Sequence, residues 1–345
     1  MKKGVLVLLL AASANGGFAR SEVPTLAATP VPLPGGLGGI GFDDLGFSPS
    51  LHMVLIPGGR SGNLDLVDST TAEVISISGF SKSEKPGGGH GEGITSVDAG
   101  RGLLFATDRT SSSLLVVDPS ASSRSIIARA ALGSEPDYVR FVAATGEIWV
   151  TEPDKERIEI FMLPASGTPT PGHAAFVPVP GGPEALVIDE TRGRAYSHLW
   201  KGSTVEIDLL NRTVLRTWKN GCVGSRGIAL DAKRGFLFVG CSEGKAVVLG
   251  LEKDGAVLGS LEHGSGVDII HYNQDLGHLY LPGGRSATLA ILAVAPTGAL
   301  SLVGTAKTAG GAHCVVSDDR RQVWICDPDH GQLLLVRDTL AAAGS

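Results

Sequence analysis

The chain has few aromatic residues, little excess charge and no long apolar segment beyond its N-terminal region. Aromatic residues make up 5% of the 345 residues and the formal net charge is −6, so the sequence lacks the basic surface by which proteins bind nucleic acids. No later stretch reaches the roughly 18 apolar residues that a transmembrane helix needs. We therefore expect a soluble protein with neither a membrane span nor a nucleic-acid partner.

Several catalytic motifs are absent or out of place. The sequence has no His-Glu-x-x-His zinc motif, no dinucleotide-binding glycine fingerprint and no c-type haem attachment motif. One Gly-x-Ser-x-Gly match surrounds Ser242, but it lies in a predicted strand-to-strand turn, whereas a nucleophile elbow requires a helix after the serine. These absences favour a binding protein over an enzyme that uses one of these mechanisms.

What the sequence does contain is a repeat with a period of about 40 to 50 residues, as in β-propellers. Each copy has an apolar run, a turn with Asp and Arg-Gly, and two further apolar runs. An Asp that bonds the backbone two residues on, followed by Gly at positive φ, closes a β-hairpin. Seven copies are present, beginning at Leu45, Ile94, Val139, Leu186, Ile228, Ile269 and Cys314. The sequence predicts one all-β domain, residues 26–340, folded as a seven-bladed β-propeller of four-stranded antiparallel blades.

The two ends of the chain are predicted to meet in one blade. The last repeat ends with the apolar run 332–336 and supplies only three strands. The segment Val31–Gly36 echoes Val177–Gly182, which leads into the fourth repeat. We therefore expect the N-terminal segment to supply the outer strand of blade seven, which removes the open edge of that sheet.

The N-terminus has the features of a bacterial export signal. Lys2 and Lys3 precede the apolar stretch Val5–Ala11, and small residues then offer cleavage sites after residue 14 or 19. We predict that residues 1–19 are a signal peptide and that the mature protein is periplasmic or secreted. No cysteine lies near either cleavage site, so we expect no lipid anchor, and we expect a monomer.

Export to an oxidising compartment indicates that the four cysteines form disulfides. Cys314 opens the first strand of the last repeat and Cys326 ends the second, so the two should lie side by side at one end of a hairpin. Cys222 and Cys241 hold similar places in the fifth repeat. We predict the pairs Cys222–Cys241 and Cys314–Cys326, each worth about 2 to 4 kcal/mol. The alternative, a metal-thiolate site, lacks the close Cys-x₂-Cys spacing of zinc sites.

The residues that precede each first strand should meet at the mouth of the central channel, because the first strands of a propeller line that channel. Five of the seven repeats present a carboxylate there, one an arginine and one a histidine: Asp43 with Asp44, Glu92, Asp137, Glu184, Arg226, Asp268 and His313. Like charges in a confined mouth raise one another's pKa or recruit a cation. We predict a site for a cation, a small ligand or an exported protein partner. The alternative is that these carboxylates only cap turns and bond backbone amides.

Loops expected on the same face add candidate ligands. His198 and Trp200 are placed to contact an organic ligand, and His90 beside carboxylates suits a transition metal. The predicted metal ligands are Glu92, Asp137, Glu184, His90 and His313, for calcium or a transition metal. No cofactor other than such a divalent cation is expected.

Two strand-end patterns point to a family. They are Phe105-Ala-Thr-Asp108, which Leu114-Leu-Val-Val-Asp118 follows, and Trp149-Val-Thr-Glu152. They resemble the Tyr-Val-Thr-Asn-like runs of the YVTN-type seven-bladed propellers, which include the YncE-like periplasmic proteins. The resemblance implies an exported binding or scaffolding propeller. Neighbouring propeller families include metal-dependent lactonases and esterases, so a metal-dependent hydrolase is the alternative function, although the predicted ring lacks the asparagines with which the lactonases hold calcium.

Overall fold

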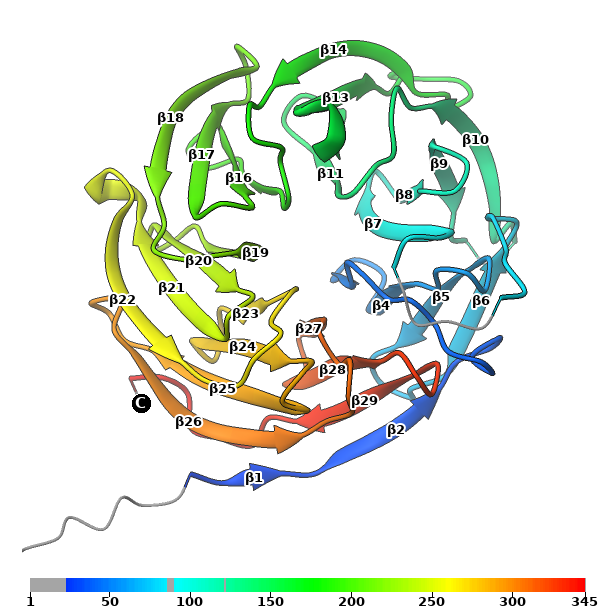
Figure 1. Cartoon of the computed structure of the whole chain (residues 1–345). Coiled ribbons are helices and arrows are strands. Elements are labelled where there is room, and N and C mark those ends of the chain that lie inside the picture. The colour runs from blue at the N-terminus through cyan, green and yellow to red at the C-terminus, as the bar shows by residue number, and fades with distance from the viewer. Residues whose placement is uncertain (1–22, 86–89, 121, 345) are drawn as a thin grey trace, which may run out of the picture.

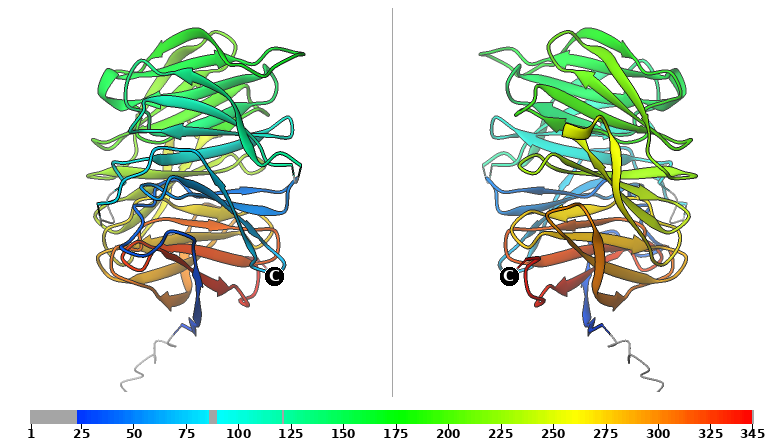
Figure 2. Two further views of the ribbon diagram at one scale, coloured as in Figure 1. Left: turned by 90° about the vertical axis from the view of Figure 1, so that its right-hand side faces the viewer. Right: turned by 90° about the vertical axis from the view of Figure 1, so that its left-hand side faces the viewer.

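The chain forms seven β-sheets arranged as blades around a central axis (Figure 1). The computed structural model describes residues 23–85, 90–120 and 122–344. Successive strands of a blade pair antiparallel from the channel outward, and the strands run across the thickness of the ring (Figure 2). The predicted all-β seven-bladed propeller is confirmed. The predicted signal peptide, residues 1–19, lies outside the described residues.

Blades one to three follow one another along the chain, and each has its innermost strand first. Blade one consists of β3 (Gly46–Ser48), β4 (Met53–Pro57), β5 (Asn63–Asp68) and β6 (Val74–Ser78). Blade two consists of β7 (Ile94–Gly100), β8 (Leu103–Asp108), β9 (Ser113–Asp118) and β10 (Ser125–Ala131). Blade three consists of β11 (Val139–Val142), β12 (Glu147–Glu152), β13 (Arg157–Met162) and β14 (Gly172–Pro178), with the 3₁₀ turn η1 (Pro153–Lys155) after β12.

Blades four to seven repeat this arrangement. Blade four consists of β15 (Val187–Asp189), β16 (Arg194–Leu199), β17 (Ser203–Asp208) and β18 (Thr213–Lys219). Blade five consists of β19 (Ser225–Asp231), β20 (Phe236–Cys241), β21 (Lys245–Gly250) and β22 (Ala256–Glu262), with η2 (Leu251–Lys253) after β21. Blade six contains β23 (His271–Asn273), β24 (His278–Gly283), β25 (Thr288–Val294) and β26 (Leu300–Lys307), and blade seven contains β27 (Val315–Ser317), β28 (Gln322–Asp327) and β29 (Gln332–Arg337).

The middle strands are apolar on both faces because each blade packs between two others. In β9, Leu115 and Val117 join a cluster with residues of blade one, whereas Leu114 and Val116 join a cluster with residues of blade three. All four side chains are fully buried. A strand that packs on both faces reads as a continuous apolar run, as the sequence shows.

The N-terminal segment closes the ring as predicted. Strand β2 (Ala28–Pro32) pairs antiparallel with β29, with Val31 opposite Leu333, and completes blade seven as its fourth strand. A further strand was not predicted: β1 (Thr25–Leu26) pairs parallel with β26 and gives blade six a fifth strand (Figure 1). Among the described residues, no helix is long and apolar enough to cross a membrane.

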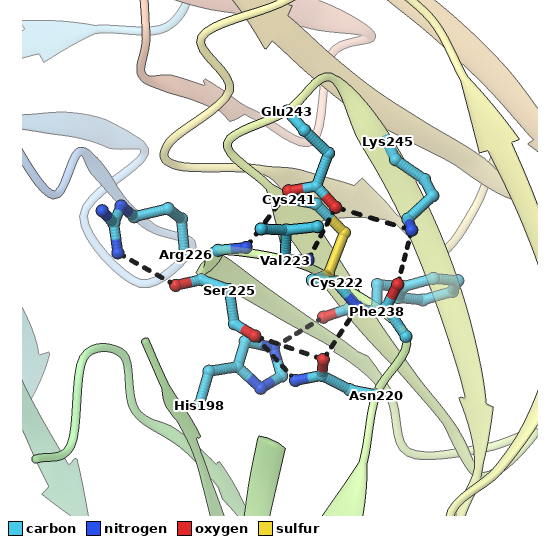
Figure 3. The surroundings of a disulfide bond; sticks show 12 residues. His198, Asn220, Cys222, Val223, Ser225, Arg226, Phe238, Cys241, Glu243 and Lys245 are labelled. Carbon is cyan, nitrogen blue, oxygen red and sulfur yellow. Dashed lines mark hydrogen bonds and ion pairs between the residues drawn. A yellow bond between two sulfur atoms is a disulfide. The ribbon is translucent and has the colours of Figure 1, made fainter. Parts of the chain in front are cut away.

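Both predicted disulfides are present. The Cα atoms are 5.4 Å apart in Cys222–Cys241 and 5.6 Å apart in Cys314–Cys326. The first bond ties the loop before β19 to the end of β20 (Figure 3). In the loop before β19, the backbone N–H of Val223 donates a hydrogen bond at 2.8 Å to Glu243, which lies in the turn after β20. The loop is therefore fixed covalently and by hydrogen bonds.

In blades four and five an Asp and a Gly close the first hairpin, as predicted, but the Asp bonds the backbone three residues on and not two. Asp189 and Asp231 each accept the backbone N–H of the arginine three residues on, and Gly193 and Gly235 adopt positive φ of 63° and 67°. Blade two differs, because its Asp98 accepts a hydrogen bond at 2.7 Å from the backbone N–H of Phe141 in blade three. Its carboxylate therefore links two blades and does not close its own turn.

Candidate functional site

A pocket of about 240 Å³ lies at one mouth of the channel, where connections from several blades meet. Its lining includes six of the predicted site residues: Asp43, His90, Asp137, Glu184, Trp200 and Asp268. These residues are spread along the sequence from position 43 to position 268. The equivalent positions of successive blades bring them together, as the repeat alignment predicts.

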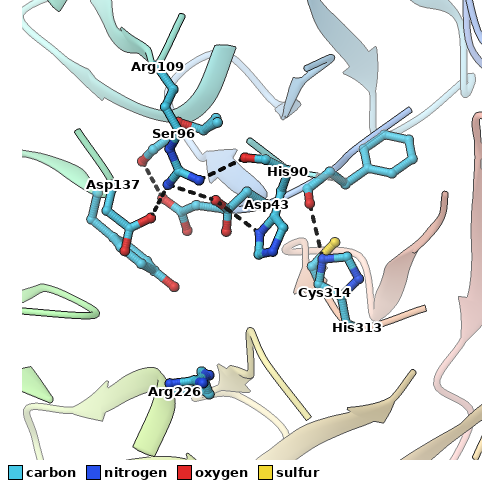
Figure 4. A network of polar contacts seen from close by, with 12 residues as sticks. Asp43, His90, Ser96, Arg109, Asp137, Arg226, His313 and Cys314 are labelled. Carbon is cyan, nitrogen blue, oxygen red and sulfur yellow. Dashed lines mark hydrogen bonds and ion pairs between the residues drawn. The ribbon is translucent and has the colours of Figure 1, made fainter. Parts of the chain in front are cut away.

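Arg109 is the centre of the polar network in this pocket (Figure 4). Its Nη2 lies 2.5 Å from a carboxylate oxygen of Asp137 and 3.5 Å from one of Asp43. Its Nη1 donates to the carbonyl of His90 at 2.8 Å and its Nε to the carbonyl of Pro136 at 3.0 Å. Arg109 was not among the predicted site residues. The signal was present, since Arg109 directly follows the second strand of blade two and a ring of carboxylates needs a counter-charge.

A second arginine occupies the opposite side of the mouth. The guanidinium carbon of Arg226 lies 4.8 Å from the centroid of the Trp200 ring, and its Nη1 lies 3.4 Å from a carboxylate oxygen of Glu184. The indole of Trp200 is 51% exposed. The pair formed by Glu184 and Trp200 therefore already holds one guanidinium group of the protein itself, by charge and by a cation–π contact.

The carboxyl groups of the pocket raise one another's pKa. Burial, followed by the charge of Asp137, raises the pKa of Glu184 to about 9, although Arg226 acts in the opposite direction. Burial and the charge of Asp43 also raise the pKa of Asp137 well above its ordinary value. Burial raises the pKa of Asp268, against the charge of His313. The pocket therefore has more carboxyl groups than the basic side chains around it can neutralise.

Two histidines flank Asp268. The ring centroids of His90 and His313 are 5.5 Å apart, and one ligand atom from each of His90, Asp268 and His313 lies within 4.8 Å of the others. The hydrogen bond and the charge of Asp43, whose carboxylate is 3.5 Å from His90 Nδ1, raise the pKa of His90 to about 9. In His313, Nδ1 lies 2.6 Å from the carbonyl oxygen of Gly311 and Nε2 lies 3.0 Å from that of Phe42.

Five predicted site residues do not line the pocket: Arg226 and His313, which contact residues of the mouth, and Asp44, Glu92 and His198, which do not. Asp44 points down the channel, where its carboxylate accepts hydrogen bonds from Nη1 and Nη2 of Arg140 at 2.6 and 3.1 Å. Glu92 is exposed at the surface and lies outside the pocket lining. His198 is fully buried, with Nδ1 2.9 Å from the Thr204 hydroxyl, and burial lowers its pKa to about 4.

Strand periodicity explains the error at His198. This residue belongs to β16, which ends at Leu199, so its side chain packs within the body of the ring. Trp200 follows the strand and is free to reach the mouth. Of the five predicted metal ligands, the structure groups His90 and His313 and adds Asp268, whereas Asp137 and Glu184 contact arginines and Glu92 lies apart.

Below the mouth, the channel widens into a cavity of about 360 Å³. Its lining is mainly aliphatic, with residues such as Leu186, Ile228 and Ile269, and its polar groups include Asp44, Asp98 and Arg140. Because Asp44 and Arg140 bind each other, this cavity offers a ligand fewer free charges than the mouth does. The chemistry of the site is therefore concentrated at the mouth.

No protein-family model and no curated protein matches the sequence. Solved structures match the fold. A chain of a structure titled "Crystal Structure of Mitotic Checkpoint Complex" is 13% identical, with a TM-score of 0.74 over 98% of this chain and 99% of that one. A chain of hydrazine synthase from Kuenenia stuttgartiensis is 12% identical, with a TM-score of 0.69 over 95% of this chain and 99% of that one. At such low identity these similarities establish a seven-bladed propeller and nothing about function.

Proposed function

We propose that the protein is an exported, non-enzymatic propeller that binds a small organic cation at the acidic mouth of its channel. One observation carries the proposal: the pocket is lined by six carboxylate side chains but only two basic ones, Arg109 and His90. The carboxylates are Asp43, Glu135, Asp137, Asp154, Glu184 and Asp268. A ligand with an ammonium or guanidinium group supplies positive charge that stabilises the ionised form of these carboxyl groups, whose pKa is raised in the pocket.

The contact between Arg226 and Trp200 supports the proposal, because it is an example within the protein of the contact that such a ligand would make. A cation that lies over an aromatic ring gains about 0.5 to 2 kcal/mol, and a carboxylate at its edge adds a charge-assisted hydrogen bond. Trp200 is half exposed and lines the same pocket as Asp154 and Asp137, so the pocket offers a ligand both an aromatic ring and carboxylates.

Export and family form part of this proposal. The basic start and apolar stretch of residues 1–19 support a periplasmic or secreted location, and the strand-end patterns near Asp108 and Glu152 support a YVTN-type propeller. In both respects the sequence agrees with a binding role outside the cytoplasm.

Calorimetric titration of the mature protein with butylguanidinium and with butylurea tests the proposal, because the two compounds have nearly the same shape and differ in charge. We expect butylguanidinium to bind at least tenfold more tightly, with an affinity that falls as salt rises. Trp200→Ala should weaken binding about threefold to thirtyfold, the loss of one cation–π contact. Glu92→Gln removes an exposed carboxylate outside the pocket and should change nothing. Equal binding of the two compounds would refute the proposal.

The cluster of His90, Asp268 and His313 favours a second candidate, a metal-dependent hydrolase. A metal ion there could activate a water molecule for ester or lactone hydrolysis. Hydrolysis of p-nitrophenyl acetate and of a γ-lactone, measured with and without added Zn²⁺, tests this candidate. Turnover that requires Zn²⁺ and is lost in Asp268→Asn would favour the enzyme over the binding protein.

A further inference from the structure

We propose that His90, Asp268 and His313 form a binding site for a divalent transition-metal ion. The site lies at the same mouth as the proposed organic-cation site and shares His90 and Asp268 with its lining, but it adds His313 and does not involve Trp200. The three residues come from three parts of the chain: the connection between β6 and β7, the segment before β23 and the segment before β27. The closed ring brings them together.

The geometry of the two imidazoles suits one shared ion. Two histidines on a tetrahedral ion, with metal–nitrogen bonds of about 2.0 to 2.1 Å, place their ring centroids roughly 5 Å apart. The rings of His90 and His313 are 5.5 Å apart. The three ligand atoms lie within 4.8 Å of one another and must move closer to reach bonding distance. His90 is able to supply this movement, since its side chain is 47% exposed.

Each histidine also has an anchor of the kind that metal-binding histidines use. Such a histidine normally binds the metal through one ring nitrogen and donates the other N–H to a carboxylate or a backbone carbonyl. Asp43 stands 3.5 Å from Nδ1 of His90. His313 has two carbonyl neighbours, those of Gly311 and Phe42. On metal binding His313 gives up one of these contacts and keeps the other, which fixes its ring.

Asp268 is a carboxylate of the mouth that no arginine holds. Within residues 23–85, 90–120 and 122–344, its side chain makes no hydrogen bond and no ion pair, whereas Asp137 and Glu184 each contact an arginine. It is therefore available as a third ligand. Cys314 and Cys326 also lie near His313, but they form a disulfide and offer no thiolate.

The donor set indicates which ions the site prefers. Two imidazole nitrogens and one carboxylate oxygen suit Zn²⁺, Cu²⁺, Ni²⁺ or Fe²⁺, and they leave positions open for water or a ligand. Calcium prefers six to eight oxygen ligands, so it should bind this set poorly.

Calorimetric titration of the chelator-treated mature protein with Zn²⁺, and in parallel with Ca²⁺, tests the inference. We expect one Zn²⁺ site and at least tenfold weaker binding of Ca²⁺. His313→Ala and Asp268→Ala should each weaken Zn²⁺ binding at least a hundredfold, and Asp43→Asn, which removes the anchor of His90, about tenfold to a hundredfold.

His330→Ala is the matched control. His330 also pairs with a carboxylate, that of Asp327 at 2.9 Å, but it does not belong to the cluster, so its removal should leave Zn²⁺ binding unchanged. If the Asp268 or His313 variant loses the native circular dichroism, His90→Ala replaces it, because His90 is more exposed than these two half-buried residues. Failure of the wild-type protein to bind Zn²⁺, or equal binding by Asp268→Ala or His90→Ala, would overturn the inference.

The metal site and the organic-cation site can fail separately. Trp200→Ala should weaken binding of butylguanidinium and leave Zn²⁺ binding unchanged, because Trp200 is not part of the metal cluster. If wild-type protein binds butylguanidinium but not Zn²⁺, only the metal site is refuted. If it binds Zn²⁺ at the three residues but binds butylguanidinium and butylurea with equal affinity, only the organic-cation site is refuted.

Discussion

Glu184→Gln tests whether the acidic mouth is under electrostatic strain. The side chain of Glu184 is 12% exposed and its pKa is raised to about 9 by burial and by its acidic neighbours. In the unfolded chain this carboxyl ionises near its ordinary pKa, 4.5. Between pH 4.5 and 9 the folded protein therefore binds a proton that the unfolded chain releases, and stability falls as pH rises.

The size of the effect follows from these two values. One unit of pKa corresponds to about 1.36 kcal/mol, so the 2.5 units between pH 4.5 and pH 7 give about 3 kcal/mol. Glutamine has nearly the same shape and does not ionise. We expect Glu184→Gln to match the wild type near pH 4 and to be more stable by about 1 to 3 kcal/mol at pH 7, where the lower figure allows for solvent screening of this partly exposed group.

Urea unfolding at pH 4, 5.5, 7 and 8 measures this difference. Glu92→Gln is the control, because Glu92 is exposed outside the pocket and its removal should leave the pH profile unchanged. A Glu184→Gln variant that is less stable than the wild type at pH 7 and 8 would show that Glu184 stabilises the ring through Arg226, and the reasoning about crowded charge would be wrong.

Three other expectations concern the body of the propeller. Deletion of residues 26–36 removes β2 and exposes the edge of β29, so we expect aggregation or a lower melting temperature, and an unchanged melting curve would mean that this strand does not hold the ring closed. Peptide mapping by mass spectrometry without reduction should recover Cys222 linked to Cys241 and Cys314 linked to Cys326, and free thiols would contradict the structure. His198, with a pKa lowered to about 4, stays neutral in the folded protein while the unfolded chain takes up a proton below pH 6.5, so stability should fall between pH 6.5 and 4 by up to about 3 kcal/mol. His198→Gln should flatten that part of the pH profile.

The fold could be predicted because the propeller repeats one local pattern. The run Leu114–Val117 and its equivalents report a strand that packs on both faces, and the turns after Asp189 and Asp231 set the hairpins. The strand β1 could not be predicted, since a pairing of two residues leaves no periodic signal. Its partner β26 is an outer strand, whose free edge accepts any extended segment that passes beside it.

The site could be predicted only at the level of blade positions. Equivalent places in the repeat brought Asp43, Asp137, Glu184 and Asp268 to one pocket. The repeat pattern does not indicate the direction in which a side chain at such a position points. Asp44 differs from its neighbour Asp43 by one position, and it turns into the channel because Arg140 of another blade offers two N–H groups there.

Zn²⁺ and an organic cation should each weaken the binding of the other at the mouth. A Zn²⁺ ion at His90, Asp268 and His313 adds positive charge beside the carboxylates that attract an organic cation, and it takes Asp268 out of their number. Coupling between two ligands is reciprocal, so each should weaken the other by the same factor, and a coupling of about 1 to 3 kcal/mol corresponds to roughly fivefold to 150-fold. Titration of butylguanidinium into the protein with saturating Zn²⁺, compared with the chelator-treated protein, measures the factor. It should vanish in His313→Ala, which retains the organic-cation pocket but loses the metal ligand. Unchanged affinity for butylguanidinium in the presence of bound Zn²⁺ would mean that the two sites are not electrostatically coupled and bind their ions independently.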